Sequence, residues 1–200
     1  MSKIGIFGGT FDPPHLGHLI LASEALEQLK LDHLLWMMTA MPPHKEALGI
    51  TPLEQRLELT RAAIAGFSQF ELSTLEIDRP GPHYSVDTVA LVKQAQPDAE
   101  IYFLMGEDSL RDLPGWHEPE RMIAMCDGLG IMRRPGSEAM LQELEFSFPN
   151  IQQKVIWFNT PMVEISSHDI RQRIREMRTY QFFIPEAVYK LIDEKKYYLK

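Results

Sequence analysis

The sequence KIGIFGGTFDPPHLGH, residues 3–18, decides how this chain folds. Its apolar beginning, Lys3 to Phe7, predicts a buried strand, and the pair Gly8 and Gly9 lets the backbone turn tightly and approach a ligand. Two histidines, His15 and His18, follow where a helix begins and presents unpaired N–H groups. Because a helix N-terminus carries partial positive charge, we expect a phosphate site here, with the imidazoles as additional donors.

The glycine spacing excludes two common phosphate loops. A dinucleotide-binding fingerprint has a third glycine opening the helix and an acidic residue about twenty positions later, and a Walker loop ends in Gly-Lys-Ser/Thr. Neither is present. The pattern resembles the nucleotidyltransferase superfamily marked by His-x-Gly-His, and the fuller form over residues 8–18 resembles the bacterial nicotinate-nucleotide adenylyltransferase family. The resemblance implies adenylyl transfer from ATP to nicotinate mononucleotide, giving deamido-NAD and pyrophosphate.

Composition limits the class of protein. The 200 residues, 44% apolar and 24% charged, suit one globular domain with a sizeable core. The net charge of −8 argues against a nucleic-acid partner, because such binding depends on cationic neutralisation of phosphates. The single cysteine, Cys126, predicts a core thiol and no internal disulfide. The chain enters a strand directly and has no apolar run of membrane-spanning length, so we expect a cytoplasmic protein without a membrane partner.

Strand-like and helix-like segments alternate along the chain. Strands are predicted at residues 3–7, 33–39, 70–73, 101–106, 128–132 and 155–159. Helices are predicted at residues 16–29, 52–65, 85–96, 118–125, 168–177 and 185–194. The first helix has an apolar stripe made of Leu16, Leu19, Ile20, Leu26 and Leu29. Residues 134–150 are the least periodic and are expected to be irregular.

This alternation predicts an α/β fold, a Rossmann-like doubly wound parallel sheet with helices on both faces, of the nucleotidyltransferase type. We expect one domain over residues 1–200, in which residues 160–200 form a C-terminal helical segment packed on the rest. Apolar residues of that segment suit packing on the sheet or a subunit contact, and we favour packing; they are Phe182, Phe183, Ile184, Val188, Tyr189 and Leu191. The oligomeric state, monomer or homodimer, stays open.

Ligands of open parallel sheets lie beyond the carboxyl ends of the strands. Five polar segments each follow a predicted strand, so we expect them to converge on one crevice; they are residues 8–18, 41–45, 106–109, 133–136 and 165–171. In the second, two prolines precede His44 and Lys45, and the segment resembles a family loop whose lysine contacts ATP phosphates. In the third, Asp108 suits ribose hydroxyls and Gly106 lets a nucleotide lie on the backbone, although Asp108 also suits a plain helix N-cap.

Two further motifs concern the acceptor. The segment Leu113-Pro114-Gly115-Trp116 resembles the family's Leu-Pro-x-Trp, which implies that Trp116 stacks on the nicotinate ring; a core tryptophan is the alternative. The turn from Tyr84 to Thr88 resembles a family turn whose backbone N–H groups bind the nicotinate carboxylate. Such a contact would again place an anion at the start of a helix. Ser85 is equally a simple N-cap candidate.

The segment Ile165-Ser166-Ser167-His168-Asp169-Ile170-Arg171 resembles the family's Ile-Ser-Ser-Thr-x-Ile-Arg. The resemblance implies that Ile165, Ser166, Ser167 and the helix start hold ATP and that Arg171 binds its phosphates. His168 replaces the usual hydroxyl residue, and its role is open. Arg173, Arg175 and Arg178 are interpreted as a solvated face. The Arg133–Gly136 turn is also family-like; Arg134 is assigned to the mononucleotide, although either arginine suits a phosphate contact.

Together these residues predict direct in-line displacement at the α-phosphorus, without a nucleophilic side chain. The expected catalytic set is His18, His15, Lys45 and Arg171, with His18, Lys45 and Arg171 supplying positive charge and His15 orienting. ATP-binding residues are predicted to include Gly8, Gly9, Thr10, Phe11, His15, His18, Gly106, Asp108, Ile165, Ser166, Ser167 and Arg171. Mononucleotide-binding residues are predicted to be Lys45, Tyr84, Ser85, Trp116 and Arg134.

Mg²⁺ is expected to arrive with ATP, without a cage of protein ligands. Three alternatives remain open. Phosphopantetheine adenylyltransferase shares the opening motif and the chemistry but lacks the Leu-Pro-x-Trp and Tyr-Ser-x-Asp-Thr elements. A nucleotide-sensing protein without turnover would be expected to lose His18 or the phosphate-binding cations. A purely structural domain would leave the five polar segments unexplained. Sequence leaves the strength of the preference for nicotinate over nicotinamide mononucleotide undecided.

Overall fold

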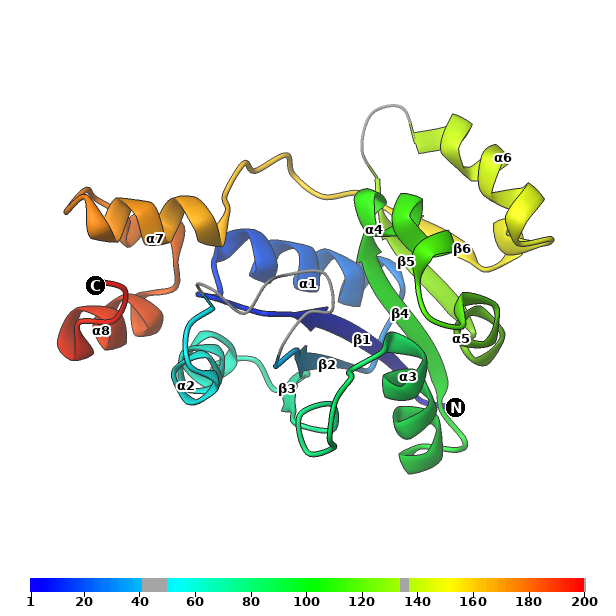
Figure 1. The fold of residues 1–200 in the computed structure, drawn as a ribbon, viewed down its shortest axis with the longest axis horizontal. Helices are drawn as coiled ribbons and strands as arrows, with labels where there is room; N and C mark the ends of the chain where they lie inside the picture. The colour runs from blue at the N-terminus through cyan, green and yellow to red at the C-terminus, as the bar shows by residue number, and fades with distance from the viewer. Residues whose placement is uncertain (41–49, 134–136, 200) are drawn as a thin grey trace.

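The computed structural model describes residues 1–40, 50–133 and 137–199, and the side chains of all of these except residues 137–140. Its six strands form one parallel sheet (Figure 1). They are β1 Lys3–Gly9, β2 His33–Met38, β3 Phe70–Ser73, β4 Glu100–Gly106, β5 Gly128–Met132 and β6 Val155–Phe158. Each lies within two residues of its predicted bounds.

The strand order is β3-β2-β1-β4-β5-β6, and every neighbouring pair is parallel. This is the order of a Rossmann-type sheet, in which the chain starts at the centre and winds outward in both directions. In the register, Ile6 lies opposite both Leu35 of β2 and Phe103 of β4. The expected Rossmann-like α/β fold is therefore confirmed.

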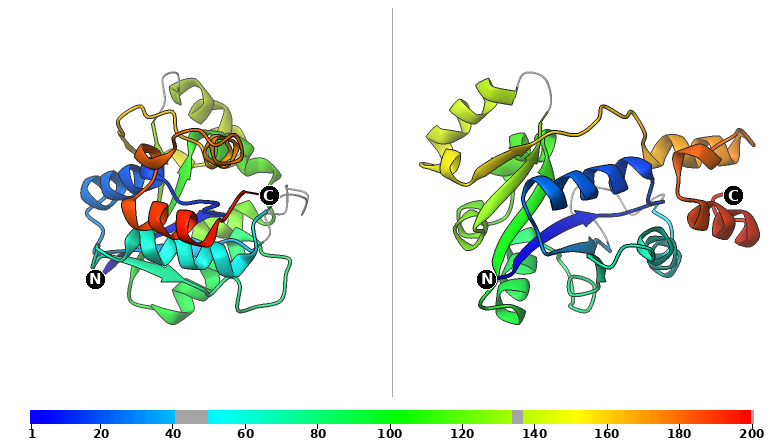
Figure 2. Two further views of the ribbon diagram at one scale, coloured as in Figure 1. Left: turned by 90° about the vertical axis from the view of Figure 1, so that its left-hand side faces the viewer. Right: turned by 180° about the vertical axis from the view of Figure 1, so that it is seen from behind.

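Helices cover both faces of the sheet (Figure 2). The α-helices, labelled α, and the short 3-10 helices, labelled η, are α1 Leu16–Gln28, α2 Leu53–Ile64, α3 Ser85–Ala95, α4 Glu107–Asp112, η1 Leu113–Gly115, α5 Pro119–Met125, α6 Ser137–Ser147, η2 Ile151–Gln153, α7 Ser167–Arg175, η3 Gln181–Phe183 and α8 Glu186–Lys195. Alternate residues of a strand point to opposite faces. Leu35 and Met37 accordingly join the core under α3 and α5, whereas Leu34 and Trp36 join the core under α1, α2, α7 and α8.

Residues 134–150 were expected to be irregular, and this prediction was wrong for residues 137–147, which form helix α6. Leu144 and Phe148, just after the helix, are each 5% exposed, and Leu141 packs beside them, so a narrow apolar stripe joins the helix to the core. Phe146, on another side of the helix, is 91% exposed. Because the apolar stripe is narrow and glutamates lie between its residues, the apolar residues of this segment show weak helical periodicity.

Two details of other helices also differ from expectation. In α1, the residues that are fully buried are Ala22 and Ala25, while Leu19 and Leu26 are only partly buried. Small side chains let the helix approach the sheet closely, so the leucines lie at the edges of the contact. Helix α3 is capped by Tyr84, and Ser85 is its first residue rather than its N-cap.

The C-terminal helices lie beyond the carboxyl end of β1, at the end of the molecule away from α6 (Figures 1 and 2). An extended segment, residues 159–166, leads to them from β6. Ile184 and Val188 are buried in the core that includes α2, and Phe183, Tyr189 and Leu191 pack against it. Phe182 is the exception, at 76% exposed. The rest of the set packs against the core that includes α2, and whether any of it also forms a subunit contact stays open.

Candidate active site

The loop that follows β1 is fixed by an aromatic cluster. The Phe11 ring is 1% exposed and packs against Phe7 and Trp36, with ring centroids 5.4 and 4.9 Å away. Its backbone adopts a positive φ of 45°. Because the whole residue is buried, Phe11 offers almost no surface to a ligand here, and its contact with ATP stays a prediction. The cluster holds the turn between the strand and α1 in one shape.

The two histidines of the motif lie against each other at the start of α1. His15 is the N-cap, and its ring stacks on that of His18 with centroids 3.7 Å apart. The backbone N–H of His15 donates to His18 Nδ1 over 3.2 Å. A nitrogen that accepts carries no proton, so the neutral His18 ring has its proton on Nε2. His18 is thereby prepared to donate one hydrogen bond.

Gly17, between the histidines, has a steric role. A Cβ at this position would lie 3.0 Å from His15 Nδ1 and 3.9 Å from the Cβ of Ile165. The same contact shows that the Ile165–Ser167 segment lies next to the His-x-Gly-His turn, as expected from the sheet order. A side chain in the middle of the motif would therefore press on the His15 ring, which would have to shift to make room.

Burial keeps both imidazoles neutral. It lowers the pKa of His15 to about 4, and burial together with the neighbouring His15 lowers the pKa of His18 well below its ordinary value. The charged form of a buried imidazole is disfavoured because it loses hydration. In the ligand-free protein His18 is therefore a neutral donor, and its role as a source of positive charge toward bound phosphates stays a prediction.

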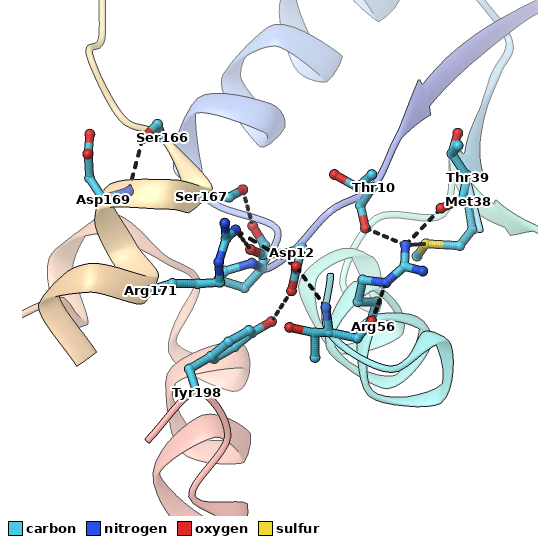
Figure 3. Close-up of polar contacts among 12 residues, drawn as sticks. Thr10, Asp12, Met38, Thr39, Arg56, Ser166, Ser167, Asp169, Arg171 and Tyr198 are labelled. Atoms are coloured by element: carbon cyan, nitrogen blue, oxygen red, sulfur yellow. Dashed lines mark hydrogen bonds and ion pairs between the residues drawn. The ribbon is translucent and has the colours of Figure 1, made fainter. Parts of the chain in front are cut away.

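Asp12 connects this loop to the C-terminal helices (Figure 3). Arg171 Nη1 donates to the Asp12 carbonyl over 2.6 Å and lies 3.8 Å from its carboxylate. Ser167 Oγ donates to the carbonyl of Pro13 over 2.8 Å. The carboxylate of Asp12, a residue only 4% exposed, also accepts from the Tyr198 hydroxyl. Two of the residues predicted to bind ATP, Ser167 and Arg171, thus contact the opening loop directly.

The rest of the Ile165–Arg171 segment is ordered by helix capping. Ser166 is the N-cap of α7 and accepts from the Asp169 N–H over 3.1 Å. Its side chain therefore already has a protein donor, while the N–H groups at the helix start remain suited to an anion. His168 is exposed. The position where the family pattern has a hydroxyl residue thus faces outward.

Arg56 was not identified from the sequence. It lies on α2, is 2% exposed, and its guanidinium donates to four carbonyl oxygens, those of Thr10, Thr39, Ala40 and Thr51, over 2.8 to 3.1 Å. Figure 3 shows the contacts with Thr10 and Thr39. These carbonyls belong to the residues that follow β1 and β2 and to Thr51, two residues before α2. Arg56 therefore fixes the loops after two neighbouring strands to one another. In the sequence, the sign of this role was one arginine among the residues of the helix face that packs on the core.

The residues assigned to the acceptor form a second group. The Tyr84 ring stacks on His117, with centroids 4.0 Å apart, and so joins the start of α3 to the loop after η1. Trp116, next in sequence to His117, is half-buried and meets Phe103 of β4 edge-on at 6.0 Å. Arg79 donates to the carbonyls of Pro82 and Tyr84 and holds the turn before α3. Trp116 is thus anchored on one side without being a core residue.

Several predicted residues lie apart from these two groups or outside the described part of the chain. Lys45 and Arg134 fall outside the described residues, as does His44. Arg133 is exposed and lies over the Trp157 ring at 5.5 Å. The segment after β4 is not a loop: Gly106 caps α4, and Asp108 lies in its first turn within 3.4 Å of Arg111. Burial of Leu110 and Leu113 explains why this polar segment is helical.

Other expectations concern chemistry outside these groups. Cys126 is 1% exposed, and burial raises the pKa of its thiol to about 12, which confirms a core thiol. Over residues 1–40, 50–133 and 137–199, no three His, Cys, Asp or Glu side chains gather in a way that would hold a metal ion. Within the same ranges no helix combines the length and apolar character needed to cross a bilayer.

Comparison with known structures supports the fold. A nicotinic acid mononucleotide adenylyltransferase from Plasmodium falciparum, solved in complex with NaAD, has a TM-score of 0.77 and 20% identity, with 99% of this chain and 98% of that one covered. At this identity the likeness concerns the fold alone.

Sequence comparison identifies the family. Residues 6–173 match the cytidylyltransferase-like family model. A probable nicotinate-nucleotide adenylyltransferase of Thermomicrobium roseum is 45% identical over 188 residues, 94% of this chain and 87% of that protein. The nicotinate-nucleotide adenylyltransferase of Bacillus subtilis is 36% identical over 198 residues, 99% of each chain. With relatives this similar over nearly their whole length, the chain belongs to the nicotinate-nucleotide adenylyltransferase family.

Proposed function

We propose that the protein transfers the adenylyl group of ATP to the 5′-phosphate of nicotinate mononucleotide, giving deamido-NAD and pyrophosphate. The observation that carries the proposal is the stacked His15–His18 pair at the start of α1, tied through Asp12 to Arg171 on α7. It places a directed donor, a helix N-terminus and a guanidinium around one loop. Family membership supports the same activity.

The proposed reaction is a direct displacement. The acceptor phosphate oxygen forms a bond to the α-phosphorus as the bond to the β-phosphate oxygen breaks, and pyrophosphate leaves with its electron pair. No side chain acts as a nucleophile, so the protein positions two polyanions and stabilises the charge that develops on the phosphates. His18 Nε2–H donates to a phosphate oxygen, and Arg171 and Lys45 supply cationic charge.

The acceptor is held at the second group of residues. Trp116 offers an indole face to the pyridine ring, and the N–H groups at the start of α3 bind the nicotinate carboxylate, with Tyr84 and Ser85 forming that turn. A carboxylate at a helix N-terminus gains charge-assisted hydrogen bonds that a neutral carboxamide lacks. This arrangement favours nicotinate over nicotinamide mononucleotide.

Mg²⁺ is proposed to enter as part of the ATP substrate. Both carboxylate oxygens of Asp12 already accept hydrogen bonds from Thr51 and Tyr198. The ion is then held mainly by phosphate oxygens and water, which agrees with the coordination that Mg²⁺ prefers at nucleotides. The cytoplasmic location and the choice between monomer and homodimer stay predictions.

The test is pyrophosphate release with ATP and Mg²⁺ and, in parallel, nicotinate mononucleotide, nicotinamide mononucleotide or phosphopantetheine. We expect release with the nicotinate substrate and a fall of roughly 10² to 10⁴-fold in His18→Ala, the range for loss of a positioned donor. His33→Ala, at the opposite end of the sheet, is the control. Release with phosphopantetheine alone would contradict the acceptor, and ATP binding without any release would indicate a nucleotide sensor.

A further inference from the structure

The carboxylate of Asp12 is surrounded by protein donors. Oδ1 accepts from the Tyr198 hydroxyl over 2.9 Å, Oδ2 accepts from the Thr51 N–H over 3.2 Å, and Arg171 Nη1 lies 3.8 Å from Oδ2. A carboxylate this deeply buried requires such partners, because an unpaired buried charge is costly. Asp12 lies three residues before His15, within the loop proposed to hold the triphosphate of ATP. An uncompensated negative charge there would repel the substrate.

Tyr198 is brought to Asp12 by the backbone that follows α8. Lys196, the C-cap of α8, and Tyr198 both adopt the left-handed conformation, with φ of 55° and 70°. This turn directs two neighbouring tyrosines to different partners. The Tyr198 hydroxyl reaches Asp12, and the Tyr197 hydroxyl donates to Glu58 of α2 over 2.8 Å. Burial, and then the Asp12 charge, raise the pKa of Tyr198, so its hydroxyl stays a donor at all ordinary pH values.

Arg171 depends on Asp12 for its orientation. Its Nη1 is held by the Asp12 carbonyl and faces the carboxylate, while its Nε is buried and has no hydrogen-bond partner among the described residues. Asp12 thus anchors the Nη1 end of the guanidinium, and other N–H groups of Arg171 remain to donate to a further group. Since the carboxylate of Asp12 is itself fixed by Tyr198 and Thr51, a contact made after α8 sets the position of a cation on α7.

We propose that Tyr198 is a positioning residue for ATP: its hydroxyl fixes the Asp12 carboxylate, which orients Arg171 and the loop before His15 for the phosphates. The inference rests on the proposed function only in taking ATP as the nucleotide. Tyr198 acts through Asp12 and need not touch the substrate. The acceptor half of the site, at Tyr84 and Trp116, is not involved.

The chain supplies a matched pair of variants, Tyr198→Phe and Tyr197→Phe. Each removes one hydroxyl that donates to a carboxylate. Tyr198→Phe is expected to lower the thermal midpoint more, because Asp12 is buried whereas Glu58 is more exposed and keeps Lys195 as a partner. The readout that separates them is the Kd for α,β-methylene ATP with Mg²⁺, measured by calorimetry without an acceptor. We expect Tyr198→Phe to weaken binding roughly 10-fold, the worth of one hydrogen bond to a charged group, and Tyr197→Phe to leave it unchanged. KM for nicotinate mononucleotide should be the same in both.

A double-mutant cycle with Arg171→Ala tests the route of the effect. If Tyr198 acts on ATP through Asp12 and Arg171, the Tyr198→Phe effect on Kd largely disappears in the Arg171→Ala background. Equal Kd values for Tyr198→Phe and Tyr197→Phe, or full additivity with Arg171→Ala, would overturn the proposal. Should Tyr198→Phe fail to fold, the same cycle is run with Asp12→Asn, because the loss of a negative charge near the phosphates affects Kd in both backgrounds and cancels in the comparison. An Asp12→Asn effect of equal size with and without Arg171 would equally overturn the proposal.

The two proposals fail in different ways. Wild-type protein that binds the ATP analogue but releases no pyrophosphate with nicotinate mononucleotide contradicts the proposed function, while the comparison of tyrosine variants can still be made. Normal turnover together with indistinguishable tyrosine variants contradicts the role of Tyr198 alone. Absence of analogue binding by the wild-type protein contradicts both.

Discussion

His15 and His18 stack with their ring centroids 3.7 Å apart and only 24° from parallel, with two residues between them in sequence. Two imidazoles in this arrangement cannot both be charged without strong repulsion. Protonation of both rings would therefore disturb the stacking. Burial lowers the pKa of each ring, so the ligand-free pair is neutral at pH 7. A polyanion bound at His18 would favour the charged form, so ATP binding is expected to be accompanied by proton uptake.

The first prediction concerns stability against pH. The pKa of His15 is about 4 in the folded protein and near 6.5 when unfolded, so the unfolded chain binds the proton first as pH falls. The contribution of neutral His15 to the free energy of unfolding is fully present above pH 6.5. It is lost progressively down to about pH 4, and the total loss is about 3 kcal/mol. Urea unfolding between pH 7.5 and 4.5 should show a flatter pH dependence for His15→Asn than for wild type. Parallel curves would contradict the buried, neutral His15.

The second prediction concerns Gly17→Ala. Alanine normally stabilises a helix by up to about 1 kcal/mol relative to glycine. Here its Cβ would lie 3.0 Å from His15 Nδ1, so the ring must move away from His18. We expect kcat for pyrophosphate release to fall at least about 10-fold, because small misplacements of catalytic groups are costly. Gly66→Ala is the control, since a Cβ there meets nothing within 4 Å. Equal kcat values in the two variants would refute the steric role.

The third prediction concerns Arg56→Lys. Lysine keeps the charge but cannot reach four carbonyls in the planar fork of a guanidinium. Several buried carbonyl groups would then lose their donors, at about 1–3 kcal/mol each, so the free energy of unfolding should fall by about 3 kcal/mol or more. Urea denaturation measures this. Arg61→Lys, an exposed position on the same helix, should change it by less than about 0.5 kcal/mol.

The fourth prediction concerns Trp116→Ala. Loss of the indole face should raise KM for nicotinate mononucleotide by about 3- to 10-fold, which corresponds to the usual worth of an aromatic pair, and should leave KM for ATP unchanged. Steady-state pyrophosphate release with each substrate varied in turn measures both. Trp157→Ala, which removes a tryptophan under Arg133, serves as the control. A rise in KM for ATP alone would assign Trp116 to the other substrate.

The sequence was sufficient for the sheet because its strands have short apolar runs with polar or glycine-rich ends. The run from Lys3 to Phe7 and the run from Gly128 to Met132 need no distant partner to be identified. The same reasoning missed helix α6: among its described side chains, over residues 141–147, Leu144 alone is deeply buried, and the charged residues around it weaken the period. A contact with the core through so few side chains is lost when the apolar pattern is averaged over a whole helix.

The motif residues were identified from local spacing, but their supporting residues were not. Arg56 acts on Thr10 across 46 positions, and Tyr198 acts on Asp12 across 186. Neither belongs to a short motif, and both residue types are common on surfaces. The neutral state of His18 likewise follows from burial beside His15, which spacing alone does not give. Contacts between distant segments and the hydration of a side chain are properties of the folded molecule.

The partners of residues 12 and 13 have a consequence for the order in which the protein matures. Ser167, Arg171 and Tyr198 reach this loop across 154, 159 and 186 positions. During synthesis the His-x-Gly-His motif leaves the ribosome well before the side chains that fix it, and contacts of such separation form late in folding. A nascent chain can therefore carry the whole motif and still lack a finished nucleotide site. Affinity for ATP would arrive only with the completion of α7 and the turn after α8.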